Sequence, residues 1–191
     1  EFAILDHLRR AGVPAAEPVA CGARARASFL ITREVAGAEI LKDRLVQERR
    51  AGKLMETLGG FVRSIHDAGV RHDDLHVGNV LVSGAGLYLV DVHRAAIRSN
   101  LSRAERIRGL GFLLLSLDTL VRMGDKRRLL RAYWGKDLSK AVLRDVGRAF
   151  RRARARVGSA LRPRSSPARA RPRRRVSALG CGRRGRGLRR D

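Results

Sequence analysis

Two short apolar runs joined by a glycine-containing turn constrain the fold of this chain more than any other feature. The runs cover residues 80–82 and 87–90, and Ser-Gly-Ala-Gly at 83–86 separates them. This spacing predicts a β-hairpin. Asn79 precedes the first run and Asp91 follows the second, so antiparallel pairing would bring both side chains to the same end of the hairpin.

The residues around the hairpin suit phosphoryl transfer from a magnesium nucleotide. Carboxylate and amide oxygens are ligands that Mg²⁺ prefers, so Asn79 and Asp91 are the candidate metal ligands. Asp74 lies five residues before Asn79 and would orient an attacking hydroxyl or accept its proton. We expect His72, the second candidate catalytic residue, mainly to brace the loop by hydrogen bonding.

The same stretch resembles a known superfamily. The pattern His72-x-Asp74-Leu75-x-x-x-Asn79, followed by Asp91, is similar to the catalytic loop and metal-binding aspartate of protein-kinase-like enzymes, including small-molecule kinases. Asp91-Val-His-Arg further resembles the corresponding segment of the bacterial lipopolysaccharide core kinases, the Kdo/WaaP family.

The resemblance implies both a fold and an activity. The expected fold is α+β, protein-kinase-like and two-lobed, with an incomplete small N-lobe and a mainly helical C-lobe. The expected activity is an ATP-dependent kinase that phosphorylates a sugar hydroxyl, of heptose or Kdo, in the lipopolysaccharide core. ATP and Mg²⁺ would be the cofactors, with Asn79 and Asp91 facing the nucleotide as well as the metal.

The resemblance continues upstream of the hairpin. The apolar pattern that begins at Glu1 resembles the family's regulatory helix, so Glu1 would pair with the nucleotide-binding lysine. Neither that lysine nor a glycine-rich loop precedes Glu1. We therefore expect an N-terminally truncated chain that alone binds nucleotide weakly. Glu34 and Ala36 fall where a hinge between lobes would bind the adenine edge through backbone groups.

Two other functions stay open at this point. Aminoglycoside-type phosphotransferases also resemble the 72–79 loop, at least as closely as the lipopolysaccharide kinases do, although their cationic substrates predict an acidic cleft. A non-catalytic scaffold is the second alternative, in which a kinase-like fold carries a basic tail that binds anionic lipid or nucleic acid. Asp73 and Val92-His93 differ from the protein-kinase pattern and argue against a phosphorylation-switched protein kinase.

Positive charge is distributed very unevenly along the chain. The formal net charge is +24, and residues 151–191 contribute +15 of it through sixteen arginines and one aspartate. This composition predicts a disordered tail. It is also the composition that a GC-rich coding region yields when read out of frame. The predicted domains are a partial N-lobe at 1–36, a helical C-lobe at 37–156 and the tail at 157–191.

Apolar periodicity and punctuation residues predict the remaining elements. A capping box begins one helix, because Ser102 is followed by Glu105 three residues later. A longer helix carries Leu54, Leu58 and Ile65 at helical spacing and ends near Gly69. The other expected elements are strands at 17–21 and 28–35 and helices at 2–11, 40–46, 103–123, from 125 to about 134, and 138–156.

The chain shows no long apolar segment, since the run at 110–117 is too short to cross a bilayer. We expect a cytoplasmic monomer that touches the anionic inner face of the inner membrane peripherally. Its partner would be the lipopolysaccharide core or another sugar substrate, and we do not expect nucleic acid as a partner. Cys21 and Cys181 are too few and too far apart to predict a disulfide framework.

Overall fold

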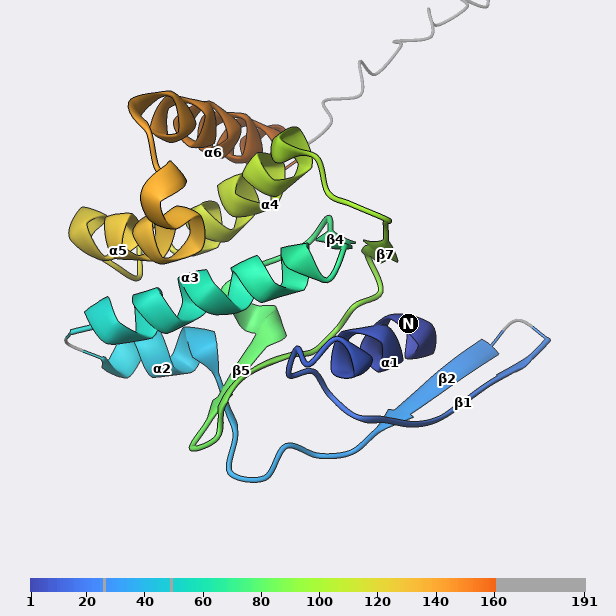
Figure 1. Ribbon diagram of the computed structural model, residues 1–191. Coiled ribbons are helices and arrows are strands. Elements are labelled where there is room, and N and C mark those ends of the chain that lie inside the picture. The colour runs from blue at the N-terminus through green and yellow to red at the C-terminus, as the bar shows by residue number, and fades with distance from the viewer. Residues whose placement is uncertain (26, 49, 161–191) are drawn as a thin grey trace, which may run out of the picture. The chain divides into compact units, whose positions relative to one another are not determined.

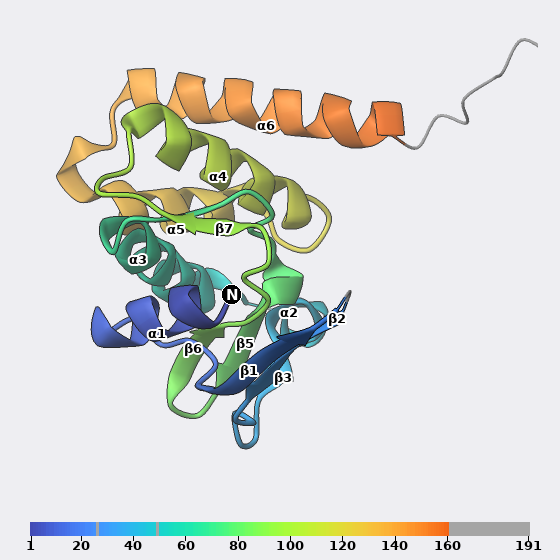
Figure 2. The same ribbon diagram turned by 90° about the vertical axis from the view of Figure 1, so that its right-hand side faces the viewer.

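A central helix, α3 (Gly52–Asp67), organises the packing of the described chain. The computed structural model describes residues 1–25, 27–48 and 50–160, and side chains as far as residue 157. Contacts group Glu1–Leu161 as one unit. The predicted tail lies almost entirely outside the described residues. Figures 1 and 2 show α3 between helix α5 on one side and the hairpin with helix α2 on the other.

Six α-helices make up about half of the described chain. Besides α3 they are α1 (Phe2–Arg10), α2 (Leu41–Gln47), α4 (Arg103–Ser116), α5 (Met123–Trp134) and α6 (Lys140–Ala160). Two 3₁₀ turns, η1 (Val77–Asn79) and η2 (Gly135–Asp137), join the larger elements.

The strands form three small antiparallel sheets. Their bounds are β1 (Pro18–Arg24), β2 (Ala27–Thr32), β3 (Glu39–Ile40), β4 (Val70–His72), β5 (Val80–Ser83), β6 (Gly86–Leu89) and β7 (Ala95–Ile97). Strand β1 pairs with β2, β5 lies between β3 and β6, and β4 pairs with β7. This mixture of helices and small antiparallel sheets confirms the expected α+β class.

Several predicted boundaries are corrected. The second strand ends at Thr32 rather than at 35, and the helix predicted from residue 40 begins at Leu41, because Ile40 pairs with Leu81 in β3–β5. The helix predicted over 103–123 ends at Ser116. The next helix begins at Met123, two residues earlier than expected, and the last one runs to 160 instead of 156.

The early end of α4 has a tertiary cause. The Asp118 carboxylate accepts a hydrogen bond from the Lys126 ammonium at 2.7 Å, and the Asp118 carbonyl faces the same ammonium at 3.4 Å. Lys126 is buried, and pairing with Asp118 compensates for the cost of burying its charge. A helix that continued through Asp118 would separate these groups, so this contact overrides the apolar pattern.

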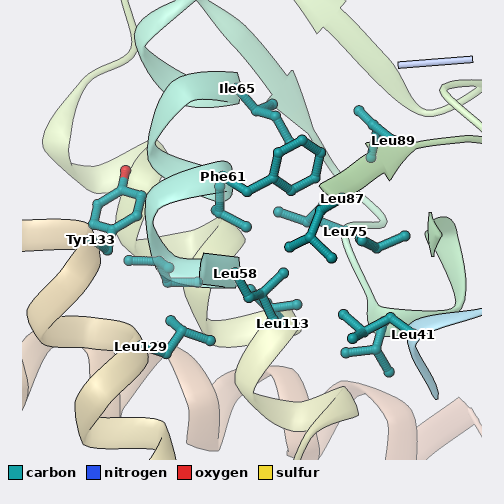
Figure 3. Packing of buried hydrophobic residues seen from close by; sticks show 14 of the residues in the cluster. Leu41, Leu58, Phe61, Ile65, Leu75, Leu87, Leu89, Leu113, Leu129 and Tyr133 are labelled. Atoms are coloured by element: carbon teal, nitrogen blue, oxygen red, sulfur yellow. The ribbon is translucent and has the colours of Figure 1, made fainter. Parts of the chain in front are cut away.

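The core forms on both sides of α3. Leu58 and Ile65 are fully buried, as are Leu75 and Leu89 from the segment that carries the hairpin. Figure 3 shows Leu58, Phe61 and Ile65 of α3 among side chains of the hairpin and of α4. Each fully buried Leu or Ile contributes about 1.5–3 kcal/mol relative to an exposed one. This packing fixes the position from which the following loop starts.

Gly59 allows α3 and α5 to approach closely. A Cβ at this position would lie 2.3 Å from the Leu129 carbonyl oxygen and 2.9 Å from the Ala132 Cβ. We therefore expect Gly59→Ala to lower the free energy of unfolding by about 1–3 kcal/mol, because α5 must shift as a whole. Chemical denaturation measures this change.

The adjacent glycine provides the matched control. A Cβ at Gly60 would have no neighbour within 4 Å. Gly60→Ala should therefore raise stability by up to about 1 kcal/mol through helix propensity alone. Equal effects of the two substitutions would contradict the close packing of α3 on α5.

A buried histidine makes the stability of the fold depend on pH. His66 Nδ1 lies 2.6 Å from the Tyr133 hydroxyl oxygen, and burial lowers the pKa of His66 to about 4. Unfolding restores an ordinary pKa near 6.5, so the unfolded chain binds the proton more readily. The stability that neutral His66 contributes is complete above pH 6.5 and is lost as the pH falls toward 4, by about 3 kcal/mol in total.

Urea unfolding at pH 7.0 and pH 4.5 tests this pH dependence. His66→Gln keeps a polar group toward Tyr133 but cannot titrate, so its stability should change much less between the two pH values. A variant with the same pH slope as the parent protein would exclude His66 as the titrating group.

Candidate active site

The hairpin places Asn79 and Asp91 at one end, as its spacing predicts. Val80 pairs with Leu89, and the Val90 N–H donates to the Asn79 carbonyl oxygen at 2.9 Å. The pairing extends to Ser83 and Gly86, so the turn contains only two residues. Asn79 therefore stands directly before β5, and Asp91 follows two residues after the end of β6.

Asp74 is held beside Asn79 through its main chain. The Asn79 side-chain amide donates from Nδ2 to the Asp74 carbonyl oxygen at 3.2 Å. This bond fixes the orientation of the amide group, and Asn79 itself is buried. Among the described residues, the Asn79 amide oxygen has no hydrogen-bond donor, so it is the atom that can act as a ligand.

His72 connects the loop with the end of the hairpin. The Asp74 N–H donates to His72 Nδ1 at 3.1 Å, so Nδ1 is the acceptor nitrogen of the ring. The proton is then on Nε2, which donates to the Asp91 carbonyl oxygen at 3.0 Å. Burial lowers the pKa of His72 and favours this neutral form, although its bond to Asp91 opposes the shift. His72 thus links the main chains of Asp74 and Asp91.

Asp91 combines an unusual backbone conformation with an accessible carboxylate. Its φ of 53° lies in the left-handed region, which non-glycine residues other than Asn and Asp adopt at a cost. Its side chain is 51% exposed, and Oδ1 lies 2.5 Å from His93 Nδ1. This hydrogen bond lowers the pKa of Asp91, so the group is ionised at neutral pH. A backbone outlier beside a charged group is typical of functional sites.

Strands β4 and β7 complete the frame, and the sequence reasoning missed both. His72 pairs with Ala95 and Val70 with Ile97, so the chain after Asp91 returns to the strand that leads into the loop. Gly69 precedes β4 with φ +76°, and a Cβ there would lie 2.2 Å from the Arg98 carbonyl oxygen. The positive φ and this close approach give Gly69 a role beyond ending α3.

A pocket of about 740 Å³ lies next to Asp91. Its lining includes Glu1, Asp91 and Val92, together with residues of β1 and β2. The structure thus brings two of the predicted nucleotide-binding residues, Glu1 and Asp91, to one cavity. Glu34 and Ala36 do not line this pocket; they lie in the segment between β2 and β3.

The oxygen donors at this end of the hairpin fit a hard cation. Asp91 offers a charged carboxylate and Asn79 a neutral amide oxygen, a set that suits Mg²⁺ completed by phosphate and water oxygens. Among the described residues no group of three His, Cys, Asp or Glu side chains forms a separate metal cluster. Such a partial ligand set is typical of nucleotide-bound magnesium rather than of a site built by protein alone.

The fold and this arrangement define the class as protein-kinase-like. The profile of the "Lipopolysaccharide kinase (Kdo/WaaP) family" matches residues 1–133. The chain therefore belongs to the Kdo/WaaP family of lipopolysaccharide kinases, as its sequence resemblance indicates.

Curated relatives carry names from two branches of this family. A 3-deoxy-D-manno-octulosonic acid kinase of Stenotrophomonas maltophilia (strain K279a) is 36% identical over 123 residues, which cover 61% of this chain and 48% of the relative. A lipopolysaccharide core heptose(I) kinase WaaP of Pseudomonas aeruginosa is 30% identical over 166 residues, 76% of this chain and 62% of the relative. The chain thus spans about half the length of the curated relatives that it matches.

A solved structure shows a similar fold. The protein described as "WaaP in complex with acyl carrier protein" superposes with a TM-score of 0.66 at 26% sequence identity. The match covers 84% of this chain and 75% of that one. None of the described helices combines the length and the apolar composition that a membrane-spanning helix requires.

Proposed function

We propose that the full-length protein is an ATP-dependent kinase that phosphorylates a sugar hydroxyl, of heptose or Kdo, in the lipopolysaccharide core. The observation that carries this proposal is the hydrogen-bond network that links the main chains of Asp74 and Asp91 through His72 and joins the Asn79 amide to Asp74 at the end of the hairpin. Membership of the Kdo/WaaP family and the names of the relatives support the acceptor class.

Each residue has a distinct proposed role. Asp74 orients the acceptor hydroxyl and takes its proton as the hydroxyl oxygen bonds to the γ-phosphorus of ATP and the bond from that phosphorus to the departing ADP breaks. Asp91 and Asn79 hold Mg²⁺, which neutralises charge on the phosphate oxygens when it is bound. His72 positions Asp74 and Asp91 through their main chains. Glu1, facing the pocket beside Asp91, is proposed to anchor a lysine of the nucleotide site, and Glu34 and Ala36 to contact the adenine edge.

The domain organisation is part of the proposal. Residues 1–36 would belong to a small N-lobe and 37–156 to a helical C-lobe, with the nucleotide between them. We further propose that the enzyme acts as a monomer on the cytoplasmic side and contacts the anionic inner membrane peripherally. Nucleic acid is not a proposed partner.

An aminoglycoside-type phosphotransferase fits the net charge of the folded residues less well. The residues before Arg151 carry a formal charge of +9, so they would repel a cationic acceptor and attract an acidic or phosphorylated one. A scaffold without catalysis would not need Asp91 in a left-handed conformation beside Asn79.

Radiolabelled phosphate transfer tests the proposal. The full-length protein is incubated with Mg-ATP and purified lipopolysaccharide core oligosaccharides that end in Kdo or in heptose, and with an aminoglycoside for comparison. We expect transfer to one of the two core acceptors only. Transfer to the aminoglycoside alone, or to no acceptor, would overturn the assignment.

A further inference from the structure

A second hollow on the described surface shares no lining residue with the proposed nucleotide pocket. It is a groove of about 800 Å³ between α4 and α6, two helices that pack side by side (Figure 2). Five arginines and one aspartate are the charged residues that line it. None of them belongs to the proposed catalytic machinery, so the groove needs a separate explanation.

Two of these arginines are not neutralised within the described chain. Arg103 Nη2 lies 3.2 Å from the Asp145 carboxylate, and Arg148 pairs with the same aspartate. Arg108 of α4 and Arg152 of α6 are exposed and form no ion pair with another described residue. Guanidinium groups bind phosphate and carboxylate through two parallel hydrogen bonds, so this pair offers donors to an anionic ligand.

The floor of the groove is apolar. Ile107 and Phe112 come from α4, and Ala149 and Ala153 lie one turn apart on α6. Gly111 lets the helices approach, because a Cβ there would lie 2.8 Å from the Ala149 Cβ. An apolar floor between cationic walls fits a lipid-linked anion. Phe112 is the single aromatic among the described lining residues, so the groove lacks the stacking surface that single-stranded nucleic acid requires.

Two residues of the groove also lie close to the catalytic loop. Arg108 and Phe112 border a small recess together with His72 and Asp73. With a volume of about 10 Å³ the recess is too small to hold part of a ligand, but it places this end of the groove near the residues immediately before Asp74.

We propose that the α4–α6 groove binds the acidic, lipid-linked part of the acceptor glycolipid, with Arg108 and Arg152 as its anion-binding residues. This inference rests on the proposed function, because it names a docking surface for the same acceptor. The reacting sugar would lie at Asp74, and carboxylate or phosphate groups elsewhere in the same glycolipid would lie against the two guanidinium groups.

Steady-state kinetics of the full-length protein test the inference with two acceptors. One is the intact glycolipid in detergent micelles, and the other is a short soluble oligosaccharide that ends in the same reacting sugar. In Arg108→Glu/Arg152→Glu, we expect the KM for the glycolipid to rise at least about tenfold through the loss of charge-assisted hydrogen bonds. The KM for ATP, and kcat and KM for the short acceptor, should stay unchanged.

A matched control separates local from general charge effects. Arg127 and Arg131 on α5 are also exposed and form no ion pair with a described residue. Arg127→Glu/Arg131→Glu changes the net charge equally and should leave the KM for the glycolipid within about twofold of the parent. Thermal unfolding of both variants shows whether each remains folded.

The outcomes distinguish this inference from the proposed function. If the parent protein transfers phosphate and all variants have the same KM for the glycolipid, the groove does not bind the glycolipid. The kinase assignment would remain intact. The same conclusion follows if both double variants raise the KM for the glycolipid equally. It also follows if the groove variant loses only its binding to vesicles containing phosphatidylglycerol, or to an acidic protein, while its KM for the glycolipid stays that of the parent. Transfer by neither parent nor variants, on either acceptor, would instead overturn the proposed function.

Discussion

Asp74→Asn should lower kcat for phosphate transfer by about 10²–10⁴-fold, the usual contribution of a positioned general base. Asparagine has nearly the same shape but cannot take a proton from the acceptor hydroxyl. The backbone bonds that Asp74 makes with His72 and Asn79 involve main-chain atoms and survive the substitution. The KM for ATP should therefore change little, and single-turnover measurements on the full-length protein separate the two effects.

The neighbouring aspartate is the control for this experiment. Asp73 pairs with Arg71 at 3.0 Å, and both side chains are partly exposed. Such a pair contributes about 0–1 kcal/mol to stability. Asp73→Asn should therefore keep kcat within a few-fold of the parent. An Asp74→Asn protein that turned over as fast as Asp73→Asn would exclude Asp74 from the chemistry.

Asp91→Asn should reduce kcat/KM by at least about a hundredfold. A neutral amide binds Mg²⁺ more weakly than a carboxylate, and a bound Mg²⁺ supplies several kcal/mol of charge stabilisation in the transition state. Asparagine tolerates the left-handed conformation that Asp91 adopts, so the fold should persist. The concentration of Mg²⁺ that gives half-maximal activity should also rise. Titration of phosphate transfer with Mg²⁺ at saturating ATP measures both effects.

Asp91→Ala separates the charge from the backbone. Alanine also removes the ligand but is strained at a φ of 53°, so it should lose about 1 kcal/mol of stability in addition to activity. If Asp91→Asn retained the parent's Mg²⁺ requirement and turnover, the carboxylate would not be a metal ligand.

The sequence predicted the parts of the site that local patterns encode. The hairpin followed from two apolar runs around a glycine-containing turn, and it alone brings Asn79 and Asp91 to one end. The capping box at Ser102 and Glu105 was also predicted and is confirmed. Because these features depend on residues close together in the chain, spacing alone was enough to find them.

Features that depend on distant residues were not predicted. Strands β4 and β7 contain three residues each, too few for a period-two pattern, and they exist because they pair with each other. The end of α4 depends on a contact between Asp118 and Lys126, which are only eight residues apart but whose pairing helical periodicity does not encode. We expected His72 to hold the loop by hydrogen bonding. Its two partners, Asp74 and Asp91, come together only when β4 and β7 pair, so the sequence did not identify them.

A structure of the full-length protein with Mg²⁺ and a non-hydrolysable ATP analogue would show whether these residues form the phosphoryl-transfer site. We expect a metal ion about 2.0–2.1 Å from a carboxylate oxygen of Asp91 and from the amide oxygen of Asn79. The Asp74 carboxylate would face the γ-phosphate across the space for an acceptor hydroxyl. A metal–nucleotide complex bound without Asp91 and Asn79, or with Asp74 directed away from the phosphates, would contradict this expectation.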